Sequence, residues 1–251
     1  MAKNNVMTHL IAGYPSMEES RKIALAMIAG GSAYLEVQFP FSDPIADGPL
    51  IQGACTEAIN NGFTQEQGFS LISELSKESD IPVFIMTYAN LVMAAGVESF
   101  VKKSRKAGAA GLIIPDLPFD YDDGLYEICK KENITVIPVI VQGISKERLE
   151  KILALNLEYL YAAIRKGITG QKSAIDSETI DFLNKISQSG SKVLAGFGIR
   201  EREQVDLLVL HSHCAVIGSA LVNNIKNSIE RKSNIAENVK NFVSTLCQDK
   251  I

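Results

Sequence analysis

The chain has 251 residues, of which 46% are hydrophobic and 22% charged, and its formal net charge is −4. This balance is typical of a globular protein and excludes a strongly basic nucleic-acid binder, because the densest basic run, KKSRK at 102–106, fits a solvated helix face. The N-terminal MAKNNVM lacks the apolar core of a signal peptide, and no apolar run approaches the roughly 20 residues that span a bilayer. The four cysteines are scattered without a CxxC pair, so we expect reduced thiols in a cytoplasmic protein.

Short apolar runs alternate along the chain with amphipathic segments of helical period. The apolar runs, rich in branched residues, lie at 6–12, 33–37, 82–88, 110–116, 134–140, 157–163, 191–197 and 213–219. Continuously apolar runs of this length are typical of parallel strands that are covered on both faces. Eight of them separated by helices predict a (β/α)8 barrel, an α/β fold, as a single domain spanning 1–251. A doubly wound open sheet is the alternative, but GYPS at 13–16 matches its glycine-rich first turn poorly.

The second β/α unit is longer than the others. Helical patterns occur at both 49–61 and 64–77, so we expect an extra helix in this unit. In a barrel of this kind, the chemistry lies at the C-terminal ends of the strands and in the loops that follow them. The list of strands therefore predicts which residues can share a site.

Acidic residues follow the second predicted strand. Glu36 lies near the end of this strand, where burial raises the pKa of a carboxyl and suits it to acid–base chemistry; the alternative is a strand-edge glutamate paired with a lysine. Asp43 and Asp47 follow in SDPIADGP, a loop that its prolines stiffen. Aspartates in such sequences often only cap turn amides. A stiff loop also loses little freedom when it holds a carboxylate in a site, so both interpretations remain open.

Glycine-containing turns follow three later strands, at GITG (167–170), GFGIR (196–200) and VIGSALV (216–222). Glycine lets backbone N–H groups approach an anion closely, and a helix N-terminus adds a favourable dipole. The loops after strands seven and eight are the frequent phosphate site of this fold. The alternative is that these are simply tight βα turns.

Other polar residues at the strand ends include Tyr88 and Tyr161. Tyr161 could present its hydroxyl to a ligand or be a core tyrosine with a satisfied hydroxyl. His9, inside the first strand, is expected to be packed and not catalytic. No metal-ligand spacing, nucleophile elbow or phosphate-binding P-loop is present. The residues thus predict an acid–base site facing a phosphate cradle, for a small phosphate ester and without a metal or redox cofactor.

The stretch EVQFPFSDPIADGPLIQ (36–52) closely resembles the signature of the tryptophan synthase alpha subunit family. The resemblance continues, in the family's order, through IAGYP (11–15), MTYANL (86–91), GLIIPDLP (111–118), RKGITG (165–170), GFGI (196–199) and IGSALV (217–222). It implies retro-aldol cleavage of indole-3-glycerol phosphate to indole and glyceraldehyde 3-phosphate, in the last steps of tryptophan biosynthesis.

The resemblance also assigns roles to residues. Glu36 matches the catalytic general acid, which can also act as a base, and Asp47 matches the carboxylate that stabilises the indole N1–H. The residues expected to bind the substrate are Tyr88, Tyr161, Thr169, Gly170, Phe197, Gly198, Gly218 and Ser219. Thr169 matches a lid-loop threonine that meets Asp47 when the loop closes.

Pro40 and Asp43 match positions that contact the beta subunit, which implies an alpha–beta–beta–alpha heterotetramer. The resemblance places pyridoxal phosphate in that partner and implies no cofactor in this chain. Four positions depart from the pattern: His9 and Ile11 replace an aromatic residue and a threonine, Gln38 replaces a glycine, and Ile164 replaces a serine. Gln38 predicts either a changed backbone route after the strand or an unstrained φ at this position. The alternatives are another phosphate-binding barrel lyase or isomerase, and a non-catalytic activating subunit.

Overall fold

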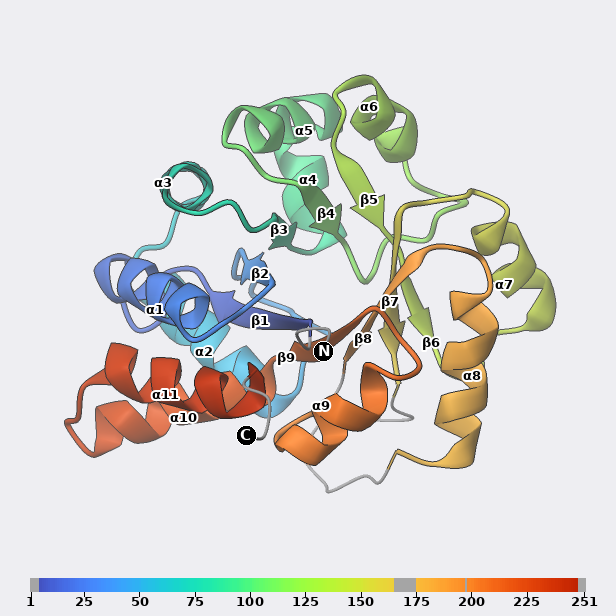
Figure 1. Cartoon of the computed structure of the whole chain (residues 1–251). Helices are drawn as coiled ribbons and strands as arrows, with labels where there is room; N and C mark the ends of the chain where they lie inside the picture. The colour runs from blue at the N-terminus through green and yellow to red at the C-terminus, as the bar shows by residue number, and fades with distance from the viewer. Residues whose placement is uncertain (1–4, 165–174, 197, 248–251) are drawn as a thin grey trace.

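The computed structural model describes residues 5–164, 175–196 and 198–247, and it shows parallel strands surrounded by helices (Figure 1). The strands are β1 (Val6–Ile11), β2 (Tyr34–Gln38), β3 (Val83–Met86), β4 (Gly111–Ile113), β5 (Thr135–Ile137), β6 (Val139–Val141), β7 (Tyr159–Ala163), β8 (Lys192–Gly196) and β9 (Cys214–Ile217). They form one sheet in the order β5-β4-β3-β2-β1-β9-β8-β7-β6, and every pairing is parallel.

Pro138 explains why eight predicted strands become nine. It separates β5 from β6, which are consecutive pieces of the predicted strand at 134–140. Proline has no N–H and cannot donate to a sheet, but its carbonyl still accepts a hydrogen bond from the Tyr161 backbone N at 3.0 Å. β5 pairs with β4 on one side and β6 with β7 on the other, so the continuous chain through Pro138 closes the cylinder. The predicted (β/α)8 barrel is confirmed.

Helices cover the outside of the sheet (Figure 1). They are α1 (Met17–Ala29), α2 (Pro49–Asn60), α3 (Gln65–Glu78), α4 (Ala89–Ala95), α5 (Val97–Lys106), α6 (Leu125–Lys131), α7 (Lys146–Leu153), α8 (Ser177–Ser187), α9 (Arg202–Leu208), α10 (Ser219–Glu230) and α11 (Ile235–Cys247). The extra helix of the second unit is confirmed as α2 and α3. Additional helices, α4 and α11, also occur in the third and last units, where the sequence patterns did not predict them. None of the described helices is long and apolar enough to cross a membrane.

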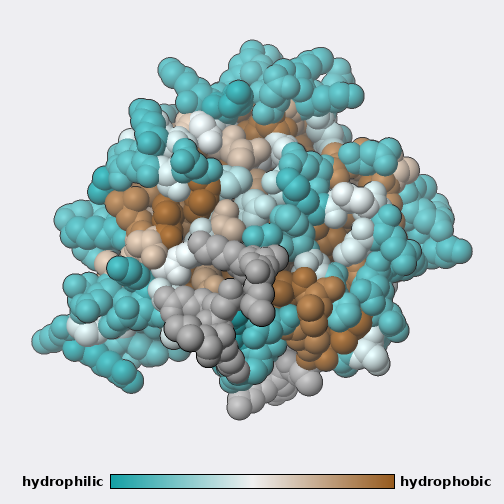
Figure 2. Space-filling model, viewed as in Figure 1, coloured by the Kyte–Doolittle hydropathy of each residue, from teal (hydrophilic) through white to brown (hydrophobic). Residues whose placement is uncertain are grey.

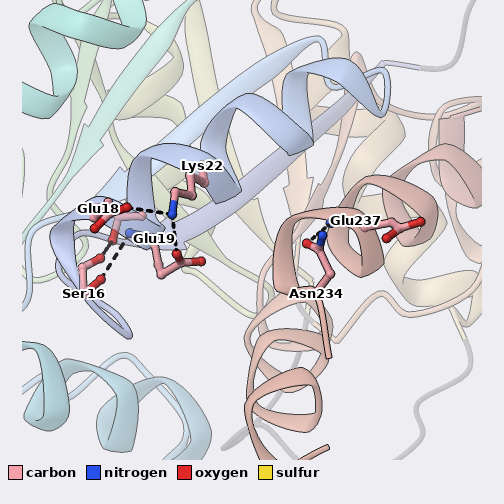
Figure 3. Close-up of polar contacts among 7 residues, drawn as sticks. Ser16, Glu18, Glu19, Lys22, Asn234 and Glu237 are labelled. Atoms are coloured by element: carbon pink, nitrogen blue, oxygen red, sulfur yellow. Dashed lines mark hydrogen bonds and ion pairs between the residues drawn. The ribbon is translucent and has the colours of Figure 1, made fainter. Parts of the chain in front are cut away.

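Local hydrogen bonds fix where the first and last helices begin (Figure 3). The Ser16 side chain accepts a bond from the Glu19 backbone N at 3.2 Å, and Asn234 does the same for Glu237 at 3.1 Å. Lys22 then pairs with Glu18 and Glu19 on the exposed side of α1. Side-chain caps of this kind satisfy amides that a helix start leaves without partners. α1 and α11 themselves lie side by side (Figure 1).

Side chains inside the barrel alternate with side chains that face the helices, as strand geometry requires. The part of the interior toward the N-terminal ends of the strands is an apolar and aromatic cluster that includes Met7, Tyr34, Phe84, Tyr159 and Cys214. Two residues further along their strands, toward the C-terminal ends, Met7 and Tyr34 are followed by His9 and Glu36. The outer helices present mostly hydrophilic residues to solvent in the view of Figure 2. The acid Glu36 and its neighbour His9 therefore lie on the C-terminal side of this apolar cluster.

Candidate active site

A cavity of about 310 Å³ opens at the C-terminal ends of the strands. It is apolar for the most part, with a small set of polar groups, as ligand sites usually are. The described residues that line it are His9, Glu36, Ala46, Asp47, Gly48, Ile51, Met86, Ile113, Pro115, Val139, Val141, Tyr161, Ala163, Gly198, Val216, Gly218 and Ser219. The lining combines residues from both halves of the chain, which only the closed barrel brings together.

Glu36 is in the middle of β2 and only 3% exposed. It faces inward with the register of Tyr34, two residues earlier, because β2 stays regular. The lysine partner of the alternative interpretation is not found among the described residues; the nearest oppositely charged group is His9, whose Nδ1 lies 3.4 Å from Glu36 Oε2. Glu36 therefore faces the cavity and is not paired at a strand edge.

Asp47 is half-buried in the loop between β2 and α2, and both interpretations of this loop hold. Its backbone forms a turn, since the Asp47 N–H bonds to Pro44 O at 3.0 Å. Its side chain lines the cavity, and Oδ2 accepts hydrogen bonds from Gln38 Nε2 and the Tyr88 hydroxyl, each at 2.8 Å. Burial raises the pKa of Asp47 and the charge of Glu36 adds to this, against the opposing effects of His9, Tyr88 and Gln38. The carboxylate is thus held rigidly and is ready to meet a developing positive charge.

The opposite wall carries the expected anion-binding features. Gly198 has a φ of 79°, in the left-handed region that favours glycine. Gly218 caps α10, a helix of 12 residues that begins at Ser219. All three line the cavity. A helix N-terminus with glycine beside it presents backbone amides to an anion, so this wall can bind a phosphate.

Tyr161 projects from β7 into the same cavity, half-buried. Burial raises its pKa well above the usual value, with the Glu36 and Asp47 charges acting in the same direction. Its hydroxyl passes over Gly196, where an added Cβ would lie 2.8 Å away. Thr169, Gly170 and Phe197 lie outside the residues that the structure describes, as do Arg165 and Lys166 of the RKGITG match.

The family model of the tryptophan synthase alpha chain matches residues 1–250. A tryptophan synthase alpha chain of Helicobacter hepaticus is 42% identical over 227 residues, which are 88% of this chain and 85% of the relative. The chain belongs to the tryptophan synthase alpha chain family. A mutant tryptophan synthase alpha-subunit from the hyperthermophile Pyrococcus furiosus has a TM-score of 0.87 and 30% identity, covering 97% of this chain and 98% of that one. A tryptophan synthase complex from the same organism matches at 29% identity and the same TM-score, with 97% and 98% coverage.

Membership of the tryptophan synthase alpha chain family confirms the resemblance seen in the sequence. It also confirms the expectation of an enzyme of tryptophan biosynthesis that performs the lyase step. Family membership does not by itself assign a role to any residue of the cavity. Within the described ranges, no group of three or more His, Cys, Asp or Glu side chains could hold a metal ion, and the expected absence of a metal stays a prediction.

Tyr88 differs from the expected role of a substrate contact. It is fully buried, is not among the described cavity-lining residues, and donates to Asp47 while accepting a bond from the Ala46 N–H at 3.2 Å. Burial, with the Asp47 charge, raises its pKa. Phe41 stacks on its ring at 5.6 Å between centroids. The structure therefore places Tyr88 behind Asp47, where it positions the carboxylate.

Gln38 takes a regular place in β2, opposite Ile11 and Met86, and its φ is not positive, so of the two expectations the unstrained φ is confirmed and the changed backbone route does not occur. The substitution acts through the side chain instead, because Gln38 donates to Asp47. His9 is packed as expected, at 3% exposure, and it stands where the resemblance has an aromatic residue; what the sequence did not predict is that it contacts Glu36 while lining the cavity. The sequence did contain a signal: His9 lies two residues after Met7 in the first strand, so its side chain faces the same side, the barrel interior.

The two residues expected to contact a partner differ in exposure. Asp43 is exposed in the loop after β2, whereas Pro40 is buried. Between Asp43 and Asp47, Ile45 is 78% exposed, which is unusual for an isoleucine. Asp116, another polar residue at a strand end, accepts a bond from the Ala89 N–H at the start of α4. It has a structural role in capping that helix.

Proposed function

We propose that this cavity cleaves indole-3-glycerol phosphate to indole and glyceraldehyde 3-phosphate through acid–base chemistry by Glu36 and Asp47. One observation carries the assignment: the two carboxylates and the glycine-lined start of α10 line the same cavity. The phosphate would bind the amides at Gly198, Gly218 and Ser219. The indole would then lie across the cavity, beside Tyr161 and the apolar wall, within reach of Glu36.

In the proposed mechanism, Glu36 donates a proton to the indole C3, which places positive charge on the ring around N1. The Asp47 carboxylate stabilises that charge through the N1–H. Glu36, now ionised, accepts the proton of the C3′ hydroxyl, the bond between the ring and the glycerol carbon breaks, and its electrons restore the neutral indole. The hydroxyl carbon becomes the aldehyde. No net proton is consumed, so one carboxyl can serve as acid and then as base.

Three residues outside the described ranges also belong to the proposal. Thr169 would close over Asp47 with the lid, and Gly170 and Phe197 would extend the binding site. Tyr88 would act through Asp47 and not by contact with the substrate, as its burial and hydrogen bond support.

The first prediction is that Glu36→Gln abolishes indole release but leaves binding of the phosphate ester within a few fold. The substitution keeps the shape of the side chain and removes its ability to exchange a proton. Indole formation is followed spectrophotometrically, and binding by calorimetry with the same compound. Glu57→Gln, on the exposed side of α2, is the matched control and should keep full activity. Near-normal turnover in Glu36→Gln would reject the mechanism, because the reaction would then proceed without a proton from this side chain.

The proposal includes a partner, the tryptophan synthase beta subunit, and assigns pyridoxal phosphate to it. Pyridoxal phosphate enzymes hold their cofactor on a lysine, and none of the described residues lining the cavity is a lysine, so these residues do not fit the cofactor. The solved complex from Pyrococcus furiosus supports an assembly. The alpha–beta–beta–alpha stoichiometry, the single domain over 1–251 and the cytoplasmic location remain predictions.

A further inference from the structure

His9 and Glu36 form a buried contact that the proposed mechanism does not use. They are direct neighbours in the parallel pairing of β1 with β2, and each is 3% exposed. His9 Nδ1 lies 3.4 Å from Glu36 Oε2, which is ion-pair distance when the imidazole is protonated. Both side chains line the cavity, so the contact lies in the wall of the site.

His9 has a distinct charge among the groups around it. The titratable side chains that line the cavity with it are Glu36 on β2, Asp47 in the loop after β2 and Tyr161 on β7, and Cys214 of β9 lies deeper in the barrel. The start of α10 also approaches His9, at Gly218, but carries no titratable group there. The described lining contains no lysine or arginine. His9 is therefore the one described lining residue that can place a positive charge beside the two carboxylates.

The electrostatic balance at His9 favours that charge. Burial lowers the pKa of His9, but the charge of Glu36 and its contact with the ring, with smaller contributions from Asp47 and Gln38, outweigh burial and leave the pKa raised. A cation in the same cavity lowers the cost of having both acids ionised at once, as they are after Glu36 has donated its proton.

A purely structural role does not account for the ring. His9 Nε2 is buried and has no hydrogen-bond partner among the described residues. A core histidine normally has both ring nitrogens satisfied, since an unpaired buried polar atom loses its hydrogen bonds to water without replacement. The ring thus directs Nδ1 toward Glu36 and leaves Nε2 without a hydrogen bond from the described residues.

We propose that His9 is a positioning residue for Glu36: its ring holds the Glu36 carboxyl group at the β1 side of the cavity, and its positive charge balances the charges of Glu36 and Asp47 once Glu36 has donated its proton. The inference rests on the proposed role of Glu36 as the acid and base. It assigns His9 no contact with the reacting atoms. Loss of His9 should therefore slow the chemical step more than it weakens substrate binding.

The direct test is the titration of His9 by NMR in the substrate-free chain. The ring signal is assigned by its disappearance in His9→Asn, and its midpoint is compared between the wild type and Glu36→Gln. Burial lowers the pKa of His9, and the charge of Glu36 is the largest effect that raises it. Without that charge, the titration midpoint of His9 should fall. Glu57→Gln should leave it unchanged. An unchanged midpoint in Glu36→Gln would overturn the proposal, whatever the chain's catalytic activity.

The kinetic test compares two substitutions at the same position. His9→Phe fills the space without a polar atom, and we expect a fall in kcat of about 10–100-fold with KM within threefold. His9→Asn keeps a donor near the place of Nδ1 and should recover part of the lost rate. His213→Asn, at the opposite end of the barrel where His213 bonds to the Tyr34 hydroxyl, is the control and should behave as wild type.

The outcomes separate this inference from the proposed function. If Glu36→Gln is inactive while His9→Phe keeps wild-type kcat, only the role of His9 is wrong. A higher KM with unchanged kcat in His9→Phe would also reject it, because the ring would then contact the substrate. If Glu36→Gln remains active, the proposed function itself fails. Should His9→Phe not fold, the titration of His9 in Glu36→Gln still decides.

Discussion

Asp47 shows at the scale of a single residue how a site can oppose stability. Its carboxylate is removed from most of its water and lies in the same cavity as Glu36, and these effects raise its pKa. The hydrogen bonds from Tyr88 and Gln38 offset part of this cost. The folded protein therefore binds a proton at Asp47 more tightly than the unfolded chain does. This contribution to stability is present below the unfolded pKa, near 3.8, and is lost as the pH rises through the folded value.

We predict that Asp47→Asn raises the melting temperature at pH 7 and lowers indole formation by about 10²–10³-fold. The amide oxygen can still accept both hydrogen bonds, and a neutral side chain escapes the cost of burying charge. Thermal unfolding between pH 4 and pH 8 should show the gain growing with pH. A melting temperature at pH 7 below that of the wild type would contradict the account of Asp47.

At the scale of the elements, the loop that carries Asp47 is anchored where it leaves β2. Phe39 is fully buried and packs edge-to-face on Phe63, Phe69 and Phe100, at 5.7, 5.2 and 6.4 Å between ring centroids. α3 approaches this ring so closely that Gly68 fits under it. The extra helix of the second unit thus fixes the start of the catalytic loop.

A matched pair of glycines tests this anchor. A Cβ at Gly68 would lie 2.7–3.0 Å from three atoms of the Phe39 ring, whereas at Gly53 of α2 it would meet nothing within 4 Å. Gly68→Ala should cost about 1–3 kcal/mol because the ring cannot move within its aromatic cluster. Gly53→Ala should gain about 0.5–1 kcal/mol from helix propensity alone. Urea unfolding measures both, and a gain in Gly68→Ala would show that the ring yields.

At the scale of the whole molecule, the site exists because the two ends of the chain meet. β1 pairs with both β2 and β9. The helices of the two ends also pack closely: a Cβ added at Gly30, which caps the end of α1, would lie only 2.8 Å from the Val243 side chain on α11. His9 and Glu36 come from the first two strands, Tyr161 from β7 and Gly218 from the end of β9. A barrel that failed to close would separate the acids from the phosphate wall.

The open end of the barrel also predicts how the molecule meets its partner. Ile45 is 78% exposed in the loop after β2, at the end where the cavity opens. We predict that a cognate beta subunit binds this chain and accelerates indole formation at least tenfold, and that Ile45→Asp weakens the complex at least tenfold without changing the rate of the isolated chain. Leu210→Asp, at a 75% exposed position before β9 and so at the other end, is the control. Size-exclusion chromatography and a titration of the indole assay measure both effects; no complex and no activation would reject the partnership.

Local patterns in the sequence were sufficient for the barrel, for the extra helix of the second unit and for Glu36 and Asp47 as candidates. A continuously apolar run indicates a strand that is buried on both faces. An acidic residue at the end of such a strand, or just after it, must then lie at the C-terminal end of the barrel. The same logic failed at α4 and α11, whose existence depends on the surfaces they cover. It also gave no reason for the strand at 134–140 to divide at Pro138, since pairing with two different neighbours is a property of the closed sheet.

The sequence by itself determined the fold class and the end of the barrel where the chemistry lies, because strand and helix periods are local and the position of a loop follows from them. Only the tertiary structure decided the contact of His9 with Glu36, the bonds of Gln38 and Tyr88 to Asp47, and the burial of Pro40. These depend on strand register and on the shape of the cavity. The chemical character of a buried charge is set by neighbours that are distant along the chain, which no local pattern contains.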